Sequence, residues 1–278
     1  MPTSADNHNA SDNKQSQIQK DFLWLHIREL PYFRALLRAV EARFYQDIKL
    51  PAPILDVGCG DGHFAAAAFD EPLDFGLDPW HTPLREAAGR GSYRFLVQSD
   101  GGGMPFPDNY FGSAISNSVL EHIPNIEEVL SETARVLKPR APFYFCVPNN
   151  NFNPNLTVAK NLDKYGLSSL GDNYRNFFDR IARHIHLDPP QVWSDRLEDA
   201  GFEIQRWWHY YSPGAQRVTE LGHYFGLPSL VSQKITGKWI LVPTRWNLAL
   251  PYNLTKKYYD EDPRCDNGVC TFYIAQRY

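Results

Sequence analysis

The chain has 278 residues, of which 43% are hydrophobic and 22% charged, the proportions of an ordinary globular protein. Lys and Arg total 28 against 32 Asp and Glu, for a formal net charge of −4, which argues against a nucleic-acid-binding protein. Four cysteines are too few for a disulfide scaffold, and the sequence holds no run of about 18 apolar residues that could span a bilayer.

The first 20 residues are polar and rich in Asn, Ser, Asp and Gln, which predicts a disordered tail. They contain no apolar segment of the kind that a secretory signal needs, so we expect a cytoplasmic protein. From Phe22 to Ile48 the apolar residues recur at helical spacing. Pro31 either splits this segment into two helices or kinks one.

Between residues 53 and 148, short apolar runs alternate with helical patterns. Such alternation is typical of an α/β fold with a mostly parallel sheet and helices on both faces. The expected strands are Pro53–Val57, Leu73–Leu77, Tyr93–Val97, Ser113–Ser116 and Pro142–Val147, and the clearest helix is Asn125–Leu137.

After Pro148 the alternation breaks into two irregular sections, residues 149–188 and 212–262. Further expected elements are a helical stretch around Tyr174–Ile185, a helix Pro189–Ala200, and strands Phe202–Tyr211 and Val269–Gln276. We therefore expect one domain over residues 21–278. Its core takes about residues 50–148, 189–211 and 266–278, and the insertions 149–188 and 212–265 form a substrate cap.

Gly58, Gly60 and Gly62 follow the strand that should end at Val57 and precede a helical pattern over Phe64–Phe69. Glycines suit this place because the backbone must turn tightly and approach a ligand with no side chain between them. Surface turns also use glycine, so the G-x-G-x-G spacing alone does not establish a ligand site.

Acidic residues end the next two expected strands. Asp78 ends the run FGLD and follows Gly58 by 20 residues. In nucleotide-binding α/β folds, an acid about 20 residues after the glycine loop binds the ribose hydroxyls. Asp100 follows the third strand, and a helix cap or turn is the alternative for either acid taken alone. Asp56 and Asp61 add negative charge beside the loop, which disfavours a dinucleotide and favours a cationic sulfonium ligand.

The run ILDVGCGDG at 54–62 resembles the glycine loop of class I S-adenosylmethionine-dependent methyltransferases, in the broad type 11-like group. Other motifs of this superfamily follow in order: MPFPDNYF at 104–111, SVLEHI at 118–123, ETARVLKP at 132–139 and DAGF at 199–202. The resemblance implies a Rossmann-like, mostly parallel seven-stranded sheet with helices on both faces, an antiparallel last strand, and helical or irregular insertions.

The resemblance also implies S-adenosylmethionine as the methyl donor and assigns it a set of residues. Asp56 would orient the loop and the donor's amino group, and Asp78 would hold the ribose hydroxyls. Asp100 and Gly101 would read the adenine edge, and Asn117 would contact the methionine end. The full predicted set is Asp56, Gly58, Cys59, Gly60, Asp78, Pro79, Asp100, Gly101, Asn117 and Ser118.

His122 is the candidate general base, because it lies at the end of the fourth strand, where open sheets bind ligands, and imidazole titrates near neutral pH. The alternative is that it only packs beside the cofactor. No metal site is expected. The pair His184 and His186 lacks a third ligand, and Cys265 and Cys270 flank a turn without completing a zinc site.

The acceptor should be selected outside the motifs, over residues 1–48, 149–188 and 212–262. Tyr174, Phe178 and Trp239 are the candidate acceptor contacts, with a satellite core under long loops as the alternative. The segment Lys238–Tyr252 mixes Trp, aliphatic and basic residues and could touch a membrane interface. We favour a buried lid, because two prolines interrupt any continuous amphipathic helix.

These observations predict a methyltransferase that moves a methyl group to a small or lipid-like organic acceptor by in-line displacement. The alternatives are a tRNA or protein methyltransferase and a non-catalytic S-adenosylmethionine-binding subunit. The acidic balance argues against a nucleic-acid partner, and the sequence makes no prediction of oligomeric state.

Overall fold

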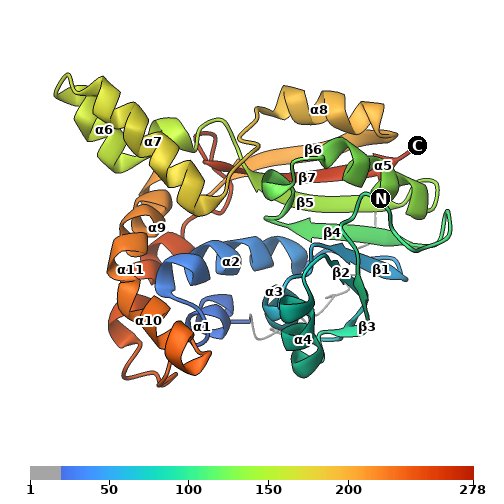
Figure 1. Ribbon diagram of the computed structural model, residues 1–278, viewed down its shortest axis with the longest axis horizontal. Helices are drawn as coiled ribbons and strands as arrows, with labels where there is room; N and C mark the ends of the chain where they lie inside the picture. The colour runs from blue at the N-terminus through green and yellow to red at the C-terminus, as the bar shows by residue number, and fades with distance from the viewer. Residues whose placement is uncertain (1–19) are drawn as a thin grey trace, which may run out of the picture.

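The computed structural model describes residues 20–278, and its centre is a seven-stranded sheet of order β3-β2-β1-β4-β5-β7-β6 (Figure 1). All neighbouring strands pair in parallel except β7, which runs antiparallel to both β5 and β6. The predicted fold class is confirmed, including the antiparallel last strand. The strands are β1 (Ile54–Val57), β2 (Leu73–Asp78), β3 (Tyr93–Gln98), β4 (Ser113–Asn117), β5 (Pro142–Pro148), β6 (Phe202–Tyr210) and β7 (Cys270–Arg277).

Helices cover both faces of the sheet, with α2 and α3 on one face and α5 and α8 on the other (Figure 1). Pro31 separates α1 from α2, because its ring fixes the extended backbone that precedes the first turn of α2. The helices up to residue 199 are α1 (Phe22–Ile27), α2 (Tyr32–Tyr45), α3 (His63–Ala68), α4 (His81–Arg90), α5 (Ile126–Val136), α6 (Thr157–Lys164), α7 (Ser168–Ala182) and α8 (Pro190–Asp199).

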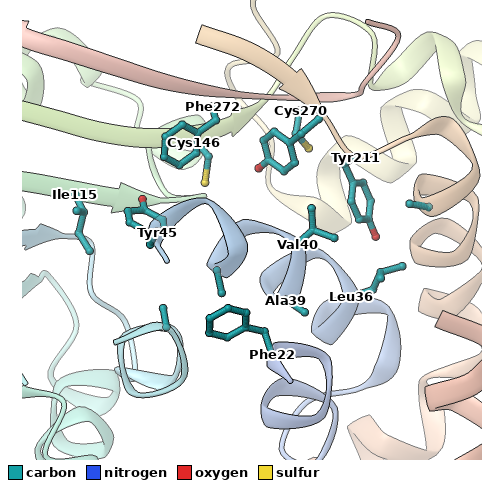
Figure 2. Close-up of a cluster of buried hydrophobic side chains, with 14 of the residues drawn as sticks. Phe22, Leu36, Ala39, Val40, Tyr45, Ile115, Cys146, Tyr211, Cys270 and Phe272 are labelled. Carbon is teal, nitrogen blue, oxygen red and sulfur yellow. The ribbon is translucent and has the colours of Figure 1, made fainter. Parts of the chain in front are cut away.

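The sheet separates two hydrophobic clusters. One of them contains Leu36 and Val40 of α2, Phe22 of α1 and Phe272 of β7, all labelled in Figure 2, and the Tyr45 ring of α2 lies 5.5 Å from that of Phe272. The other cluster places Trp193 of α8 against the opposite face. The central strands are buried on both sides, and all five residues of β4 are buried. This arrangement explains their short apolar sequences and fixes the strand ends rigidly in space.

The section 212–262 is largely helical, and the prediction that it is irregular is wrong. It contains α9 (Pro213–Phe225), α10 (Leu227–Thr236) and α11 (Ala249–Tyr259). Its prolines suggest helix breaks, yet Pro213 and Pro228 lie in first turns, where no backbone N–H donor is needed. The Ser212 hydroxyl caps α9 by accepting from the Ala215 amide at 3.1 Å.

The tail expected over residues 1–20 lies, apart from Lys20, outside the described residues. Lys20 forms an ion pair with Asp70 at 2.7 Å. Within residues 20–278, no helix has the length and apolar character needed to cross a membrane.

Candidate functional site

A cavity of about 590 Å³ opens where the carboxyl ends of β1, β2 and β4 face α2. We call it the donor cavity. Its volume lies within the range of about 300–1,000 Å³ that is usual for small-molecule sites. Of the residues predicted to bind the cofactor, it is lined by Asp56, Gly58, Cys59, Gly60, Asp78, Pro79, Asn117 and Ser118, and it also includes His122 and Trp239.

The glycine loop forms one wall of the donor cavity and is tied to the end of β2. The amides of Gly58 and Cys59 both donate to the Leu77 carbonyl, at 2.8 and 2.9 Å. Gly58 has φ of +80°, and a Cβ atom there would lie 2.3 Å from a methyl group of Val119. Glycine is therefore required at position 58 both by backbone conformation and by space.

The carboxylate of Asp78 is held in one orientation by two backbone amides. Its Oδ2 accepts from Gly60 at 3.0 Å, and its Oδ1 accepts from Trp80 at 2.9 Å. Burial raises the pKa of Asp78, and the two amide donors oppose that rise. Each oxygen keeps acceptor capacity after these bonds, so the group can accept hydrogen bonds from a pair of hydroxyls.

Asp56 is buried beside the same cavity and accepts a hydrogen bond from the Tyr93 hydroxyl at 2.6 Å. Burial raises the pKa of Asp56 to about 7, the Tyr93 hydrogen bond lowers it, and the nearby charge of Asp78 raises it. A cationic ligand in this cavity would favour the ionised carboxylate, because an opposite charge within a few ångströms stabilises the charged form.

Glu41 of α2 organises the end of β4, and the sequence-based prediction missed it. Its fully buried carboxylate accepts from Asn117 at 2.6 Å, Ser118 at 2.7 Å, Tyr210 at 2.8 Å and Arg38 at 2.9 Å. Arg38 also donates to the Asn117 carbonyl at 3.1 Å. The sequence does contain a sign of this role, because Glu41 falls at helical spacing among the apolar residues of α2. A carboxylate on a buried helix face needs hydrogen-bond or ion-pair partners.

The donor cavity carries charges of both signs. Asp56 and Asp78 come from the strand ends, while Arg34 and Arg38 reach the cavity from α2. The Arg34 guanidinium also lies 5.5 Å from the centre of the Trp239 ring. This donor set fits S-adenosylmethionine, which presents a sulfonium, an ammonium and a carboxylate together with ribose hydroxyls.

His122 ends a short 3₁₀ helix (Leu120–His122) that follows β4. Its Nδ1 lies 2.9 Å from the Arg183 carbonyl oxygen, so Nδ1 is the donor in that bond. In the neutral ring, Nε2 is then left as the acceptor. Burial lowers the pKa of His122, which favours this neutral form at physiological pH. The arrangement can take up a proton at Nε2.

Four predicted site residues lie away from the donor cavity. Asp100 and Gly101 do not line it, and the Asp100 carboxylate accepts from the Gly102 amide at 3.1 Å. Tyr174 and Phe178 lie on α7: the Tyr174 hydroxyl donates to Glu220 at 3.0 Å, and Phe178 is buried in the core. Of the three predicted acceptor contacts, Trp239 alone reaches the cavity.

Histidines and cysteines of the described residues form no metal site, since no group of three or more His, Cys, Asp or Glu side chains there could hold an ion. The backbone amides of Ile185 and His186 donate to the Glu121 carbonyl. The H-x-H segment therefore packs against the 3₁₀ helix that carries His122.

A second cavity of about 320 Å³ adjoins the first, and we call it the apolar cavity. Leu30 and Trp239 line both cavities. The rest of its lining comes from α1, the start of α2, α10, α11 and the segment between α10 and α11. It includes Ile27, Pro228, Ile240, Leu241, Val242, Leu248 and Pro251. The sequence-based prediction named Trp239 as an acceptor contact, and Ile240, Leu241, Val242, Leu248 and Pro251 fall within the expected lid Lys238–Tyr252.

A family model described as a methyltransferase domain matches residues 24–206. Among curated relatives, the botryococcene C-methyltransferase of Botryococcus braunii is 35% identical over 112 residues, covering 37% of this chain and 30% of that protein. The sterol 24-C-methyltransferase of Pneumocystis carinii is 26% identical over 201 residues, covering 68% of this chain and 52% of that protein. The chain thus spans about half the length of these relatives or less.

Among solved structures, a Thermotoga maritima methyltransferase described as a possible histamine N-methyltransferase superposes with a TM-score of 0.52 at 15% identity. The match covers 88% of this chain and 90% of that one. At this identity the likeness concerns the fold alone. The family model extends over more than half of the sequence, from α1 into β6, and the chain therefore belongs to the methyltransferase domain family, with the class I fold that uses S-adenosylmethionine as its methyl donor.

Proposed function

We propose that this protein transfers the methyl group of S-adenosylmethionine to an apolar, lipid-like acceptor. One observation carries the proposal: the donor cavity adjoins the apolar cavity, and Leu30 and Trp239 line both. Apolar walls favour hydrocarbon burial by about 25 cal/mol per Å², whereas they leave the polar groups of a hydrophilic acceptor without partners. The sterol and botryococcene methyltransferases among the relatives support an apolar acceptor class.

S-adenosylmethionine supplies a methyl group on a cationic sulfur that is already activated for in-line displacement, so the protein's task is to bind and position. We assign the ribose hydroxyls to Asp78, because two amides fix its carboxylate at the cavity wall. We assign the donor's ammonium to Asp56 and its methionine end to Asn117, which Glu41 holds in place. The adenine assignment to Asp100 and Gly101 gains no support from the cavity, which neither residue lines.

The protein needs a base only where the acceptor loses a proton during the transfer. His122 is our candidate for that role, because it lines the donor cavity and its Nε2 is left as the ring acceptor, with the Glu121 carboxylate 3.7 Å away. Lipid-like acceptors methylated on carbon or oxygen release such a proton. An acceptor amine that carries a free lone pair would make His122 dispensable.

The test incubates the full chain with methyl-labelled S-adenosylmethionine and, separately, a total lipid extract, a water-soluble metabolite extract, bulk tRNA and bulk protein. We expect label in an organic-extractable product from the lipid extract, to be identified by mass spectrometry. Label confined to tRNA, to protein or to water-soluble products would contradict the proposed acceptor class. If no product is labelled, calorimetric titration with S-adenosylmethionine shows whether the protein fails to bind the donor or whether the acceptor is absent from the extracts.

A further inference from the structure

The cap formed by α10, the segment 238–248 and α11 presents large apolar side chains to solvent. Exposure reaches 77% for Ile235, 77% for Trp246 and 70% for Leu250. Val231 lies four residues before Ile235 on α10, and Leu254 lies four residues after Leu250 on α11, so each pair shares one exposed helix face. We call these six residues the docking face: Val231, Ile235, Leu241, Trp246, Leu250 and Leu254. The expectation that Lys238–Tyr252 forms a buried lid is wrong for Leu241, Trp246 and Leu250, which are exposed to solvent.

The apolar cavity borders the docking face at Leu241. Leu241 and Val242 line the cavity and are at the same time 58% and 46% exposed. Pro228 and Ser232 of α10 and Pro251 of α11 line the same cavity, so the two helices flank one opening. Figure 1 shows α9, α10 and α11 together beside α1 and the start of α2, away from the sheet. An acceptor entering here would pass Trp239 to reach the donor cavity.

The charge of this part of the chain is strongly one-sided. Between Glu220 and Asp260 the sequence has no acidic residue and five basic ones, Lys234, Lys238, Arg245, Lys256 and Lys257, although acids outnumber bases in the whole chain. Arg245 pairs with Asp21 at 3.4 Å, and Lys256 pairs with Asp260 at 2.7 Å. The other three form no ion pair within residues 20–278, and Lys234 and Lys238 bracket Ile235. Aliphatic and Trp side chains beside unpaired lysines are the composition that binds anionic bilayers.

The helices α6 and α7 provide an internal comparison. They also expose apolar residues, such as Tyr165 at 77% and Leu170 at 52%. Their cations, however, alternate with acids, and Arg175 pairs with both Asp163 and Asp172. Both regions therefore expose apolar surface, but of the two only the cap carries positive charge without intervening acids.

We propose that the docking face binds the surface of an anionic lipid bilayer and takes its acceptor from that bilayer through the apolar cavity. The inference deepens the proposed function, since it names the source of the lipid-like acceptor. Val231, Ile235, Trp246, Leu250 and Leu254 enter the interface, and Lys234 and Lys238 contact the anionic headgroups. The remainder of the domain stays in water, so the donor reaches its cavity from the aqueous side.

The test measures vesicle flotation of the full chain with vesicles of phosphatidylcholine alone and of phosphatidylcholine mixed with phosphatidylserine. We expect binding to the mixed vesicles that weakens as salt rises. The double variant Ile235→Ser/Trp246→Ser should bind at least about tenfold more weakly, because its apolar contact with the interface is lost. Lys234→Glu/Lys238→Glu should weaken binding to mixed vesicles by about 30-fold or more and remove the preference over phosphatidylcholine.

Tyr165→Ser is the matched control, because Tyr165 has the same exposed fraction as Ile235 and Trp246 but lies in the turn between α6 and α7. It should leave vesicle binding unchanged. All substituted positions lie outside the residues assigned to the methyl donor. The affinity for S-adenosylmethionine, measured by calorimetry, should therefore stay at the wild-type value, and an unchanged affinity shows that each variant is folded. Flotation needs neither donor nor acceptor, so its result is independent of the labelling experiment that tests the proposed function.

Three results would overturn the proposal. The first is no flotation with the mixed vesicles, and the second is an equal loss of binding in Tyr165→Ser. The third is a wild-type dimer in sedimentation that Ile235→Ser/Trp246→Ser dissociates without any effect on flotation, since the face would then bind a second copy of this chain.

Discussion

The Glu41 carboxylate accepts a hydrogen bond from the Asn117 amide at 2.6 Å, across 76 residues of sequence. This bond joins the middle of α2 to the end of β4, where the methyl-donor cavity opens. Because Arg38 and Ser118 donate to the same carboxylate, one buried acid sets the position of three cavity residues. The cavity wall at this point depends on the N-terminal helices as well as on the sheet.

Replacing Glu41 should reduce both stability and donor affinity. Glu41→Gln leaves Arg38 without its ion-pair partner, and we expect the free energy of unfolding to fall by about 2–3 kcal/mol. This is less than the 3–5 kcal/mol of a fully buried pair, because the Arg38 side chain keeps 24% exposure. Urea denaturation measures the change. Glu71→Gln, at an exposed position, should leave stability within about 0.5 kcal/mol of wild type.

Asp78→Asn should weaken S-adenosylmethionine binding by about tenfold or more. The amide retains the shape of the side chain but loses the charge-assisted hydrogen bonds that the carboxylate can make to hydroxyls. Calorimetric titration gives the dissociation constant. Asp70→Asn is the control, because Asp70 is 87% exposed and lies away from the cavity. An unchanged affinity in Asp78→Asn would show that the ribose binds elsewhere in the cavity.

Donor affinity should depend on pH through Asp56. Its pKa of about 7 lies above the ordinary carboxyl value of 3.8, so the empty protein holds this proton at mildly acidic pH. A cationic donor favours the ionised form, and affinity should therefore fall by about tenfold from pH 8 to pH 6. Asp56→Asn should make the affinity independent of pH over this range. Glu121→Gln should retain the dependence, although burial also raises the pKa of Glu121 to about 7.

The same shift has a defined effect on stability. Because the folded-state pKa of Asp56 is raised, its contribution to stability is full below about pH 4 and is lost as the pH rises through 7. Asp56→Asn should remove part of any decline in the free energy of unfolding between pH 4 and pH 7. Urea denaturation across this range, with and without the substitution, measures that part. An identical decline in both proteins would show that Asp56 ionises in the folded state as it does in water.

His122→Asn tests the proposed base without removing its structural bond. The Asn amide can still donate to the Arg183 carbonyl, as Nδ1 does at 2.9 Å, but it offers no basic nitrogen at the position of Nε2. For an acceptor that loses a proton, we expect kcat to fall by about 10²-fold with donor affinity unchanged. Full turnover with the true acceptor would assign His122 to packing alone.

Gly58→Ala should abolish donor binding, because the added Cβ would lie 2.3 Å from Val119 and the residue has φ of +80°. The expected loss of stability is about 1–3 kcal/mol, by strain of the kind stored at left-handed backbone positions. Gly89→Ala is the contrasting change: this glycine lies within α4, and its Cβ would meet open space. It should stabilise the protein by about 0.5–1 kcal/mol.

The amino-acid sequence by itself determined the sheet and the donor loop. The periodicities of 2 and 3.6 residues, the glycines at 58, 60 and 62, and the acids that end β1 and β2 are local features, so they could be recognised without knowing the fold. Seven strands and their approximate limits followed from these patterns, and the family resemblance supplied eight of the residues that line the donor cavity. The helices α9–α11 were missed because first-turn prolines have the same sequence appearance as helix breakers.

Only the tertiary structure decided the other features of the site, because they depend on contacts between residues that are distant in sequence. Glu41 meets Asn117, Ser118 and Tyr210 only after α2 packs on the sheet. Leu30 and Trp239 join two cavities from segments about 200 residues apart. Phe178 and Trp239 were equal candidates as aromatic residues in insertions, and packing buried the first in the core and placed the second at the site. Such burial is a property of the assembled chain, which no local pattern encodes.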